Sequence, residues 1–76
     1  MKSYRITREI RETATNVVTE FGTLHGCPTE SEALDYMASL HKEACAKSKF
    51  TKVTNGKRSF KAYSAGKVFI FKLGRA

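Results

Sequence analysis

Two short segments of the chain carry the residue types that most often bind zinc. His25 and Cys27 are separated by one residue, and His41 and Cys45 are four positions apart. If the second segment is helical, its two side chains share one helix face. Together the four side chains would complete the ligand set of a tetrahedral zinc site.

The distance between the two pairs argues against that site, if a helix begins at Thr29. Such a helix rises roughly 24 Å by Cys45, at about 1.5 Å per residue. The extended step back from Thr29 to Cys27 recovers only about 7 Å. The cysteines would then lie on the order of 17 Å apart, beyond shared metal coordination and beyond the ~7 Å limit for a disulfide. We expect no metal, no cofactor and reduced thiols, with His41 and Cys45 at the edge of the core and His25 in a loop.

Catalytic residues are not evident either. Neither histidine stands in a motif that activates a nucleophile, and no glycine-rich phosphate loop is present. One alternative stays open, because small endoribonucleases of the toxin type act through arginine, lysine and tyrosine alone. Arg58, Lys61 and Tyr63 are the candidates for such a set. We expect a protein that is not an enzyme.

The distribution of charge is the most informative feature of the chain. Its 14 Lys and Arg residues outnumber 7 acids, for a net charge of +7. Residues 1–26 hold four cations and three acids, and residues 27–46 hold one cation and four acids. Residues 47–76 hold nine cations and no acid. Because cations at this density repel one another, this segment favours a negatively charged partner, although lysines that merely protect a sheet edge are the alternative.

The totals predict one globular domain, residues 1–76. Apolar residues make up 41% of the chain, which is too much for a disordered basic tail. Residues 1–10 are too polar for a signal peptide, and the apolar run at residues 68–71 is too short to cross a membrane. Two cysteines are too few for a secreted disulfide scaffold. We therefore expect a cytoplasmic monomer or homodimer without a membrane partner.

The N-terminal part predicts a hairpin followed by a helix. Residues 3–11 alternate between apolar and charged types, and residues 17–24 are rich in β-branched and aromatic types, with a turn at residues 13–16. Thr29 and Glu32 have the spacing of a capping box, so a helix should start there. Its apolar positions form one stripe: Ala33, Leu34, Met37, Leu40, Ala44 and Cys45.

The C-terminal part predicts three antiparallel strands in a meander. Residues 50–54, 57–64 and 67–73 are separated by Asn55-Gly56 and Ala65-Gly66, and Asn-Gly favours a tight hairpin turn in which both residues take positive φ. The fold class is therefore α+β. We expect an N-terminal β-hairpin, one α-helix and a three-stranded antiparallel meander, with the helix packed on one face of the sheet.

Two-residue turns would fix which side chains share a face of this meander. Thr54 should face Lys57, and Ser64 should face Lys67. The face toward the helix then carries the core: Val53, Phe60, Ala62, Phe69, Phe71 and Leu73. The other face mixes cations with aromatic and aliphatic groups, as surfaces that bind phosphates and bases do.

We place the candidate binding residues on this mixed face and at the turn that borders it. They are Phe50, Lys52, Lys57, Lys61, Tyr63, Lys67, Ile70 and Lys72. The alternative is that the N-terminal hairpin or a second subunit covers the apolar part of this face, so that the lysine stems only shield it.

The outline of the chain resembles a group of small phage proteins. It opens with Met1-Lys2-Ser3-Tyr4-Arg5-Ile6-Thr7, continues with a capped helix and ends in a meander with Asn55-Gly56. In size and element order it is similar to phage-encoded proteins that disable host machinery, including some anti-CRISPR proteins. The resemblance implies a stoichiometric inhibitor that works without chemistry, and it carries over no functional residue. Many such proteins are acidic mimics of DNA, and the net charge of +7 departs from that pattern.

Two functions are therefore expected, with a third kept open. The first is an inhibitor that docks on a host protein or nucleoprotein complex in the bacterial cytoplasm. The second is direct binding of DNA or RNA through the basic meander. The third is the toxin-type endoribonuclease.

Overall fold

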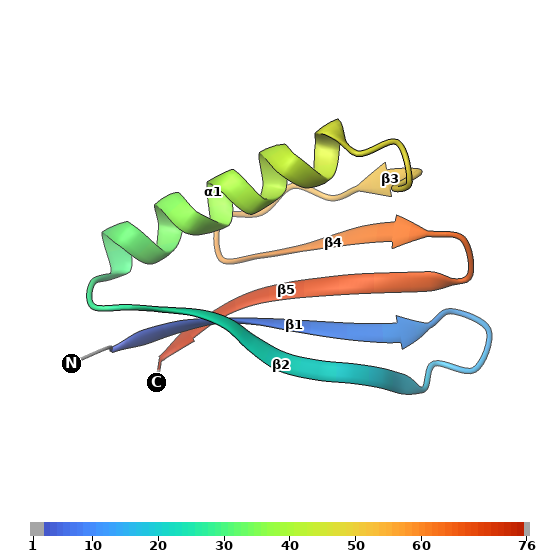
Figure 1. Ribbon diagram of the computed structural model, residues 1–76, viewed down its shortest axis with the longest axis horizontal. Helices are drawn as coiled ribbons and strands as arrows, with labels where there is room; N and C mark the ends of the chain where they lie inside the picture. The colour runs from blue at the N-terminus through green and yellow to red at the C-terminus, as the bar shows by residue number, and fades with distance from the viewer. Residues whose placement is uncertain (1–2, 76) are drawn as a thin grey trace.

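The computed structural model describes residues 3–75 and has an α+β fold with one sheet and one helix (Figure 1). The elements are β1 (Tyr4–Glu12), β2 (Val18–Cys27), α1 (Glu30–Ala46), β3 (Lys52–Val53), β4 (Ser59–Ser64) and β5 (Lys67–Arg75). The five strands are antiparallel and lie in the order β2-β1-β5-β4-β3. The expected α+β class is thus confirmed, and the sheet order is more complex than a separate hairpin and meander.

The N-terminal hairpin belongs to the same sheet as the meander. β1 pairs with β5 along its whole length, from Tyr4 opposite Arg75 to Glu12 opposite Lys67. β2 therefore forms one edge of the sheet, and the two-residue strand β3 forms the other. The hairpin therefore extends the sheet sideways and does not lie over the mixed face of the meander.

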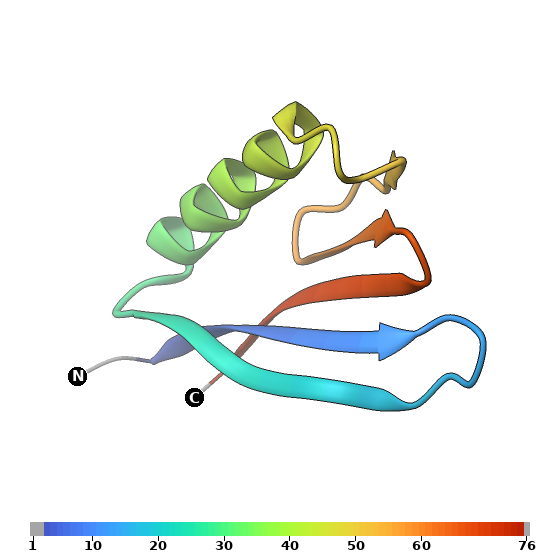
Figure 2. The ribbon, with the colours of Figure 1, turned by 45° about the vertical axis from the view of Figure 1, so that its right-hand side comes forward.

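Helix α1 packs on one face of the sheet and contacts all five strands (Figure 2). Between them lies a core of buried residues: Ile6, Met37, Ala44, Phe60, Ala62 and Phe71. The rings of Phe60 and Phe71 stack with their centroids 4.7 Å apart. No element of residues 3–75 covers the opposite face of the sheet, which we call the open face.

The start of α1 has the predicted cap. Thr29 is extended, with φ −127°, and its hydroxyl accepts a hydrogen bond of 3.3 Å from the backbone N–H of Glu32. The predicted apolar stripe is buried at Ala33, Met37 and Ala44 and half-buried at Leu34 and Leu40. Cys45 was wrongly placed in this stripe, because Ala44 takes the last core position and Cys45, next along the helix, is exposed.

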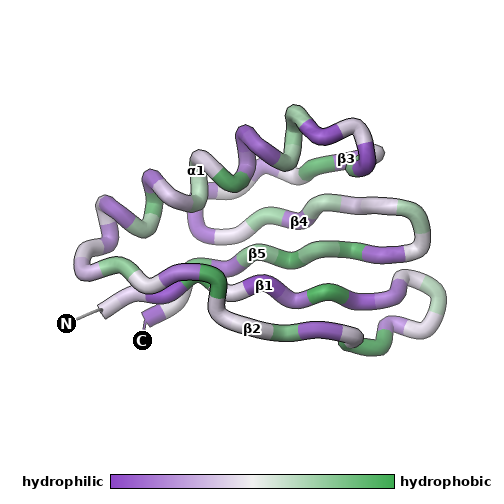
Figure 3. Tube along the Cα trace, in the orientation of Figure 1, coloured by the Kyte–Doolittle hydropathy of each residue, from purple (hydrophilic) through white to green (hydrophobic). Residues whose placement is uncertain are grey.

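The pattern of hydropathy differs between the strands (Figure 3). Along β1, buried Ile6 and Ile10 alternate with polar residues, as predicted. Along β5 the apolar residues are consecutive, and Val68, Ile70 and Phe71 are all buried although they point to both faces. This central strand has neighbours on both sides, so adjacent side chains cover it even where no helix does.

The connection between β3 and β4 is not the predicted tight Asn-Gly turn. Lys52 pairs with Tyr63, whereas the predicted turn places it opposite Ser59, a difference of four residues. Asn55 is not in the positive-φ conformation that such a turn requires, and residues 54–58 form a loop. Gly56 is still required, because a Cβ there would collide with the carbonyl of Ser59. Since the shift is an even number of residues, it leaves each strand residue on its predicted face.

The turn between β4 and β5 agrees with the prediction. Ser64 pairs with Lys67, so the register of these two strands is the expected one. Gly66 has a φ of +73°, a conformation that glycine adopts without steric cost. The faces of β4 and β5 are therefore those read from the sequence.

Candidate functional site

The open face carries three rows of side chains that cross the sheet. Residues directly paired on neighbouring strands share a face, so the strand register defines these rows. The first row contains Val18, Arg11, Val68, Tyr63 and Lys52. The second contains Phe21, Glu9, Ile70 and Lys61. The third contains Thr23, Thr7, Lys72 and Ser59.

A hollow of about 300 Å³ lies over β4 and β5 on this face. We call it the basic hollow, because its lining includes two lysines, a tyrosine and two hydroxyl groups on an apolar base: Lys61, Lys72, Tyr63, Thr54, Ser59 and Ile70. Lys52 lies beside it, directly opposite Tyr63 on β3. Cations, hydroxyl donors and an aromatic ring therefore meet at one place.

Positive charge on the open face is largely uncompensated. Arg5, Lys52, Lys61 and Lys72 have no carboxylate of residues 3–75 within ion-pair distance. Glu9, the acid in the three rows, is held by Arg11 at 2.6 Å. The other ion pairs lie elsewhere, between Arg8 and Glu20 and between Arg58 and Glu30. The open face is therefore the basic side of the molecule.

The helical side holds most of the negative charge. α1 carries four acids and one lysine: Glu30, Glu32, Asp35 and Glu43, with Lys42. At the end of β5 on this side, the pKa of Arg75 is raised above its ordinary value, first by a side-chain hydrogen bond to Tyr4 and then by the charge interaction with that side chain. Arg75 thus stays cationic but does not contribute to the open face.

The apolar residues of the open face near the hollow are mostly covered. Val68 is 8% exposed and Ile70 is 9% exposed, although no helix lies over them. Their neighbours in the rows, including Arg11, Tyr63 and Lys61, shield them. What a partner meets here is cations, hydroxyl groups and the half-buried ring of Tyr63.

Five of the eight candidate binding residues lie together on the open face. They are Lys52, Lys61, Tyr63, Ile70 and Lys72. Four of these line the basic hollow, and Lys52 stands next to it. The structure thus brings together most of the predicted set, while its binding role stays a prediction.

The other three candidates lie elsewhere, because strict alternation holds only inside a strand. Phe50 precedes β3 and packs edge-on against Phe69 on the helical side, with centroids 5.3 Å apart. Lys57 precedes β4 and lies in the loop of residues 54–58. Lys67 is the first residue of β5 and faces Ser64, on the side opposite to Val68. Phe50 and Lys57 therefore do not lie on the predicted face, and Lys67 lies at the turn that borders it.

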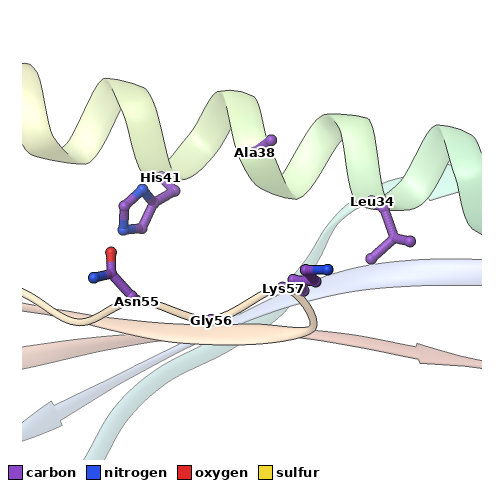
Figure 4. A pocket seen from close by; sticks show the side chains of 6 residues that line it. All are labelled: Leu34, Ala38, His41, Asn55, Gly56 and Lys57. Atoms are coloured by element: carbon purple, nitrogen blue, oxygen red, sulfur yellow. The ribbon is translucent and has the colours of Figure 1, made fainter.

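Lys57 lines a second hollow, of about 670 Å³, between α1 and the loop (Figure 4). Leu34, Ala38 and His41 face it from the helix, and Asn55 faces it from the loop. Nε2 of His41 donates a hydrogen bond of 3.0 Å to the carbonyl of Thr54, since a carbonyl can only accept. That bond holds the loop against the helix. This hollow is mainly apolar and carries a single lysine.

The histidines and cysteines are distributed through the fold. His25 lies in β2 rather than in a loop, and its ring stacks on Tyr36 of α1 with centroids 4.4 Å apart. Cys27 is buried and Cys45 is exposed, and both are free thiols. Within residues 3–75, no three His, Cys, Asp or Glu side chains are grouped as a metal site requires.

The three residues of the endoribonuclease alternative are not grouped around the basic hollow. Lys61 and Tyr63 line it, but Arg58 pairs with Glu30 of the helix. The arrangement can bind an anion through lysines and hydroxyl groups, with an aromatic ring alongside for stacking.

Several contributors to the open face were missed in the sequence, among them Arg5, Thr54 and Ser59. The alternation of residues 3–11 already placed Arg5 with Thr7 and opposite Ile6, but the pairing of β1 with β5 was not foreseen. Ser59 lies on this face by its alternation with Lys61 and Tyr63 in β4, and Thr54, at the start of the loop, also lines the hollow.

Comparison with known proteins gave no relative for this chain. No family model matches it, and neither the curated proteins nor the solved structures yielded a match. Among residues 3–75 there is also no helix with the length and apolar character needed to cross a bilayer. What the open face binds must therefore be inferred from its own geometry and charge.

Proposed function

We propose that this protein binds nucleic acid through its open face and catalyses no reaction. The observation that supports this most is the basic hollow, where Lys61, Lys72 and Tyr63 meet on a sheet face without a helix over it. Lysines position a nucleic acid through its phosphates, and aromatic rings stack on unpaired bases. A single strand offers both groups at once, so single-stranded DNA or RNA is the preferred ligand.

The lysines follow a line that suits an extended backbone. Lys72, Lys61 and Lys52 stand on three neighbouring strands, each displaced by one row from the last. Such diagonal neighbours are about 7–8 Å apart. Tyr63 lies directly opposite Lys52 and two residues beyond Lys61 on the same face. A strand that follows the three lysines therefore passes the tyrosine ring.

An inhibitor of a host nucleic-acid-handling complex, as the resemblance to phage proteins implies, would use the same surface. The burial of Val68 and Ile70 favours a polyanion over an apolar protein partner, because little apolar area is accessible near the hollow. Nucleic acid is therefore the first target to test, and a protein target is the alternative.

The test compares two charge-reversal variants by fluorescence anisotropy with labelled DNA and RNA, both single-stranded and duplex. K52E/K61E/K72E removes the lysine line. K42E/K47E/K57E makes the same change in net charge on the helix and the loop. We expect the first variant to lose at least about tenfold in affinity, and the control to stay within a few-fold, with circular dichroism to confirm that both are folded.

Two outcomes would count against the proposal. Equal losses in the two variants would mean that net charge, rather than the open face, determines binding. Absence of binding to every oligonucleotide at low salt would leave the protein-directed inhibitor, which a pull-down from bacterial lysate with the same two variants would test.

A further inference from the structure

The two edges of the sheet differ in how well they are protected. β3 is only two residues long and includes Lys52. β2 is ten residues long and leaves one side of its backbone unpaired (Figure 1). Natural sheets protect long edges with lysine, proline, an inward-pointing charge or β-bulges. β2 has two irregularities in its pairing with β1, and the residues between them pair regularly. β2 contains neither lysine nor proline, and its one acid, Glu20, is bound by Arg8 of the neighbouring strand at 2.7 Å.

The same edge carries the large apolar side chains that the fold leaves exposed. Val17, Val18 and Phe21 are 55%, 43% and 65% exposed. They lie near the turn of the hairpin. The β2 residue that packs against the core, Leu24, lies toward the other end of the strand, where α1 contacts it. An exposed apolar group along a long edge strand without lysine or proline is typical of a surface that receives another strand.

Charge selects the partner for this edge. The chain has a net charge of +7, so two copies repel one another over most of their surfaces. β2 is the strand without any lysine or arginine, whereas β1, β3, β4 and β5 each carry at least one. Two copies can therefore meet at β2 without bringing cations together, and a patch related to itself by a two-fold axis is automatically complementary in its apolar residues.

We propose that β2 pairs antiparallel with β2 of a second copy, so that two five-stranded sheets become one continuous sheet. The pairing of β2 with β1 is irregular at two points of β1, between Ile6 and Thr7 and between Ile10 and Arg11. Between these points, residues 20–23 of β2 pair with β1 without interruption. The two-fold axis passes through this segment. With the axis at Phe21, this side chain lies at the seam beside its symmetry mate, and Val18 of each copy lies farther along the seam on the same open face.

This dimer has a defined consequence for the two faces. A two-fold axis perpendicular to the sheet leaves each face on its own side, so both helices lie on one side and both basic hollows on the other. The dimer follows from the edge strand alone and does not depend on the proposed binding of nucleic acid.

Sedimentation velocity over a concentration series, without nucleic acid, tests the dimer. F21K places a charge at the seam on a side chain that is 65% exposed, so the fold tolerates it. S39K adds the same charge at an exposed position of α1. We expect wild type and S39K to dimerise and F21K to remain monomeric, with its dissociation constant raised at least about tenfold. A wild type that is monomeric at every concentration, or an F21K dimer as tight as that of wild type, would overturn the proposal.

Amide hydrogen exchange identifies the surface that is used. In wild type and S39K, amides of β2 that face away from β1 should exchange more slowly at high than at low protein concentration. F21K should show no such dependence. A dimer whose β2 amides exchange at the monomer rate would mean that another surface pairs, and β2 would be excluded. Neither result bears on nucleic-acid binding, which the anisotropy assay measures separately.

Discussion

Gly66 stands in the tight turn between β4 and β5 with a φ of +73°, and no atom lies within 4 Å of the place where a Cβ would be. Alanine fits there in space, but the left-handed backbone conformation costs roughly 1–2 kcal/mol for a residue with a Cβ. G66A should therefore lower the free energy of unfolding by about that amount in urea titrations. G74A is the control, because Gly74 also has open space and its φ is not positive. Equal stabilities of the two variants would contradict the role given to the turn.

Tyr63 lines the basic hollow from the open face, and its ring is proposed to stack on an unpaired base. Loss of one base–aromatic contact costs about 1–3 kcal/mol, so Y63A should weaken single-strand binding by about tenfold or more. Y63F keeps the ring and should bind nearly as tightly as wild type. Anisotropy titrations at fixed salt measure the difference. If Y63A bound as well as Y63F, the ring would have no part in the site.

At the scale of elements, the cap of α1 is the contact most clearly defined by sequence. The hydroxyl of Thr29 satisfies the N–H of Glu32, and its loss leaves that donor without its partner in the first turn. T29A should reduce stability by about 1 kcal/mol. S31A, in the same turn but exposed, should change stability little. Thermal unfolding followed by circular dichroism compares them, and a T29A melting curve that overlays that of S31A would show the cap to be unimportant.

Elements with local signals were predicted well, and their pairing was not. The helix and the two flanking strand regions follow from periodicity and from Thr29, which act over a few residues. The pairing of β1 with β5 joins Tyr4 to Arg75, and no local pattern encodes such a contact. The turn at Asn55 failed for a related reason, because Thr54 is hydrogen-bonded to Lys61 of β4 and to His41 of the helix, and the local preference of Asn-Gly encodes neither contact.

The open face was nevertheless largely predicted, because side-chain alternation is robust to an even shift in register. Lys52, Lys61, Tyr63 and Lys72 kept their face although the partner of Lys52 moved by four residues. Residues outside the strands, such as Lys57, were misplaced since alternation does not apply to them. The contribution of the N-terminal hairpin required knowledge of the whole sheet.

Over the whole molecule, charge is separated between an acidic helix and a basic open face. Four acids on α1 lie on the far side of the sheet from Arg5, Lys52, Lys61 and Lys72. A polyanion is therefore attracted more strongly to the open face than to the helix. This polarity orients the ligand before any contact forms, and such steering weakens as salt is added.

The salt dependence of binding gives a quantitative test of how many cations act. Each phosphate contact on a single strand contributes a slope of roughly −0.7 to log K against log salt, so four contacts predict a slope of about −3. K52E/K61E/K72E should reduce its magnitude to about 1 or less, whereas K42E/K47E/K57E should keep it near that of wild type. Anisotropy between about 50 and 200 mM salt covers the range over which such slopes are large. A wild-type slope near zero, or one unchanged in the open-face variant, would show that the lysine line does not contact phosphates.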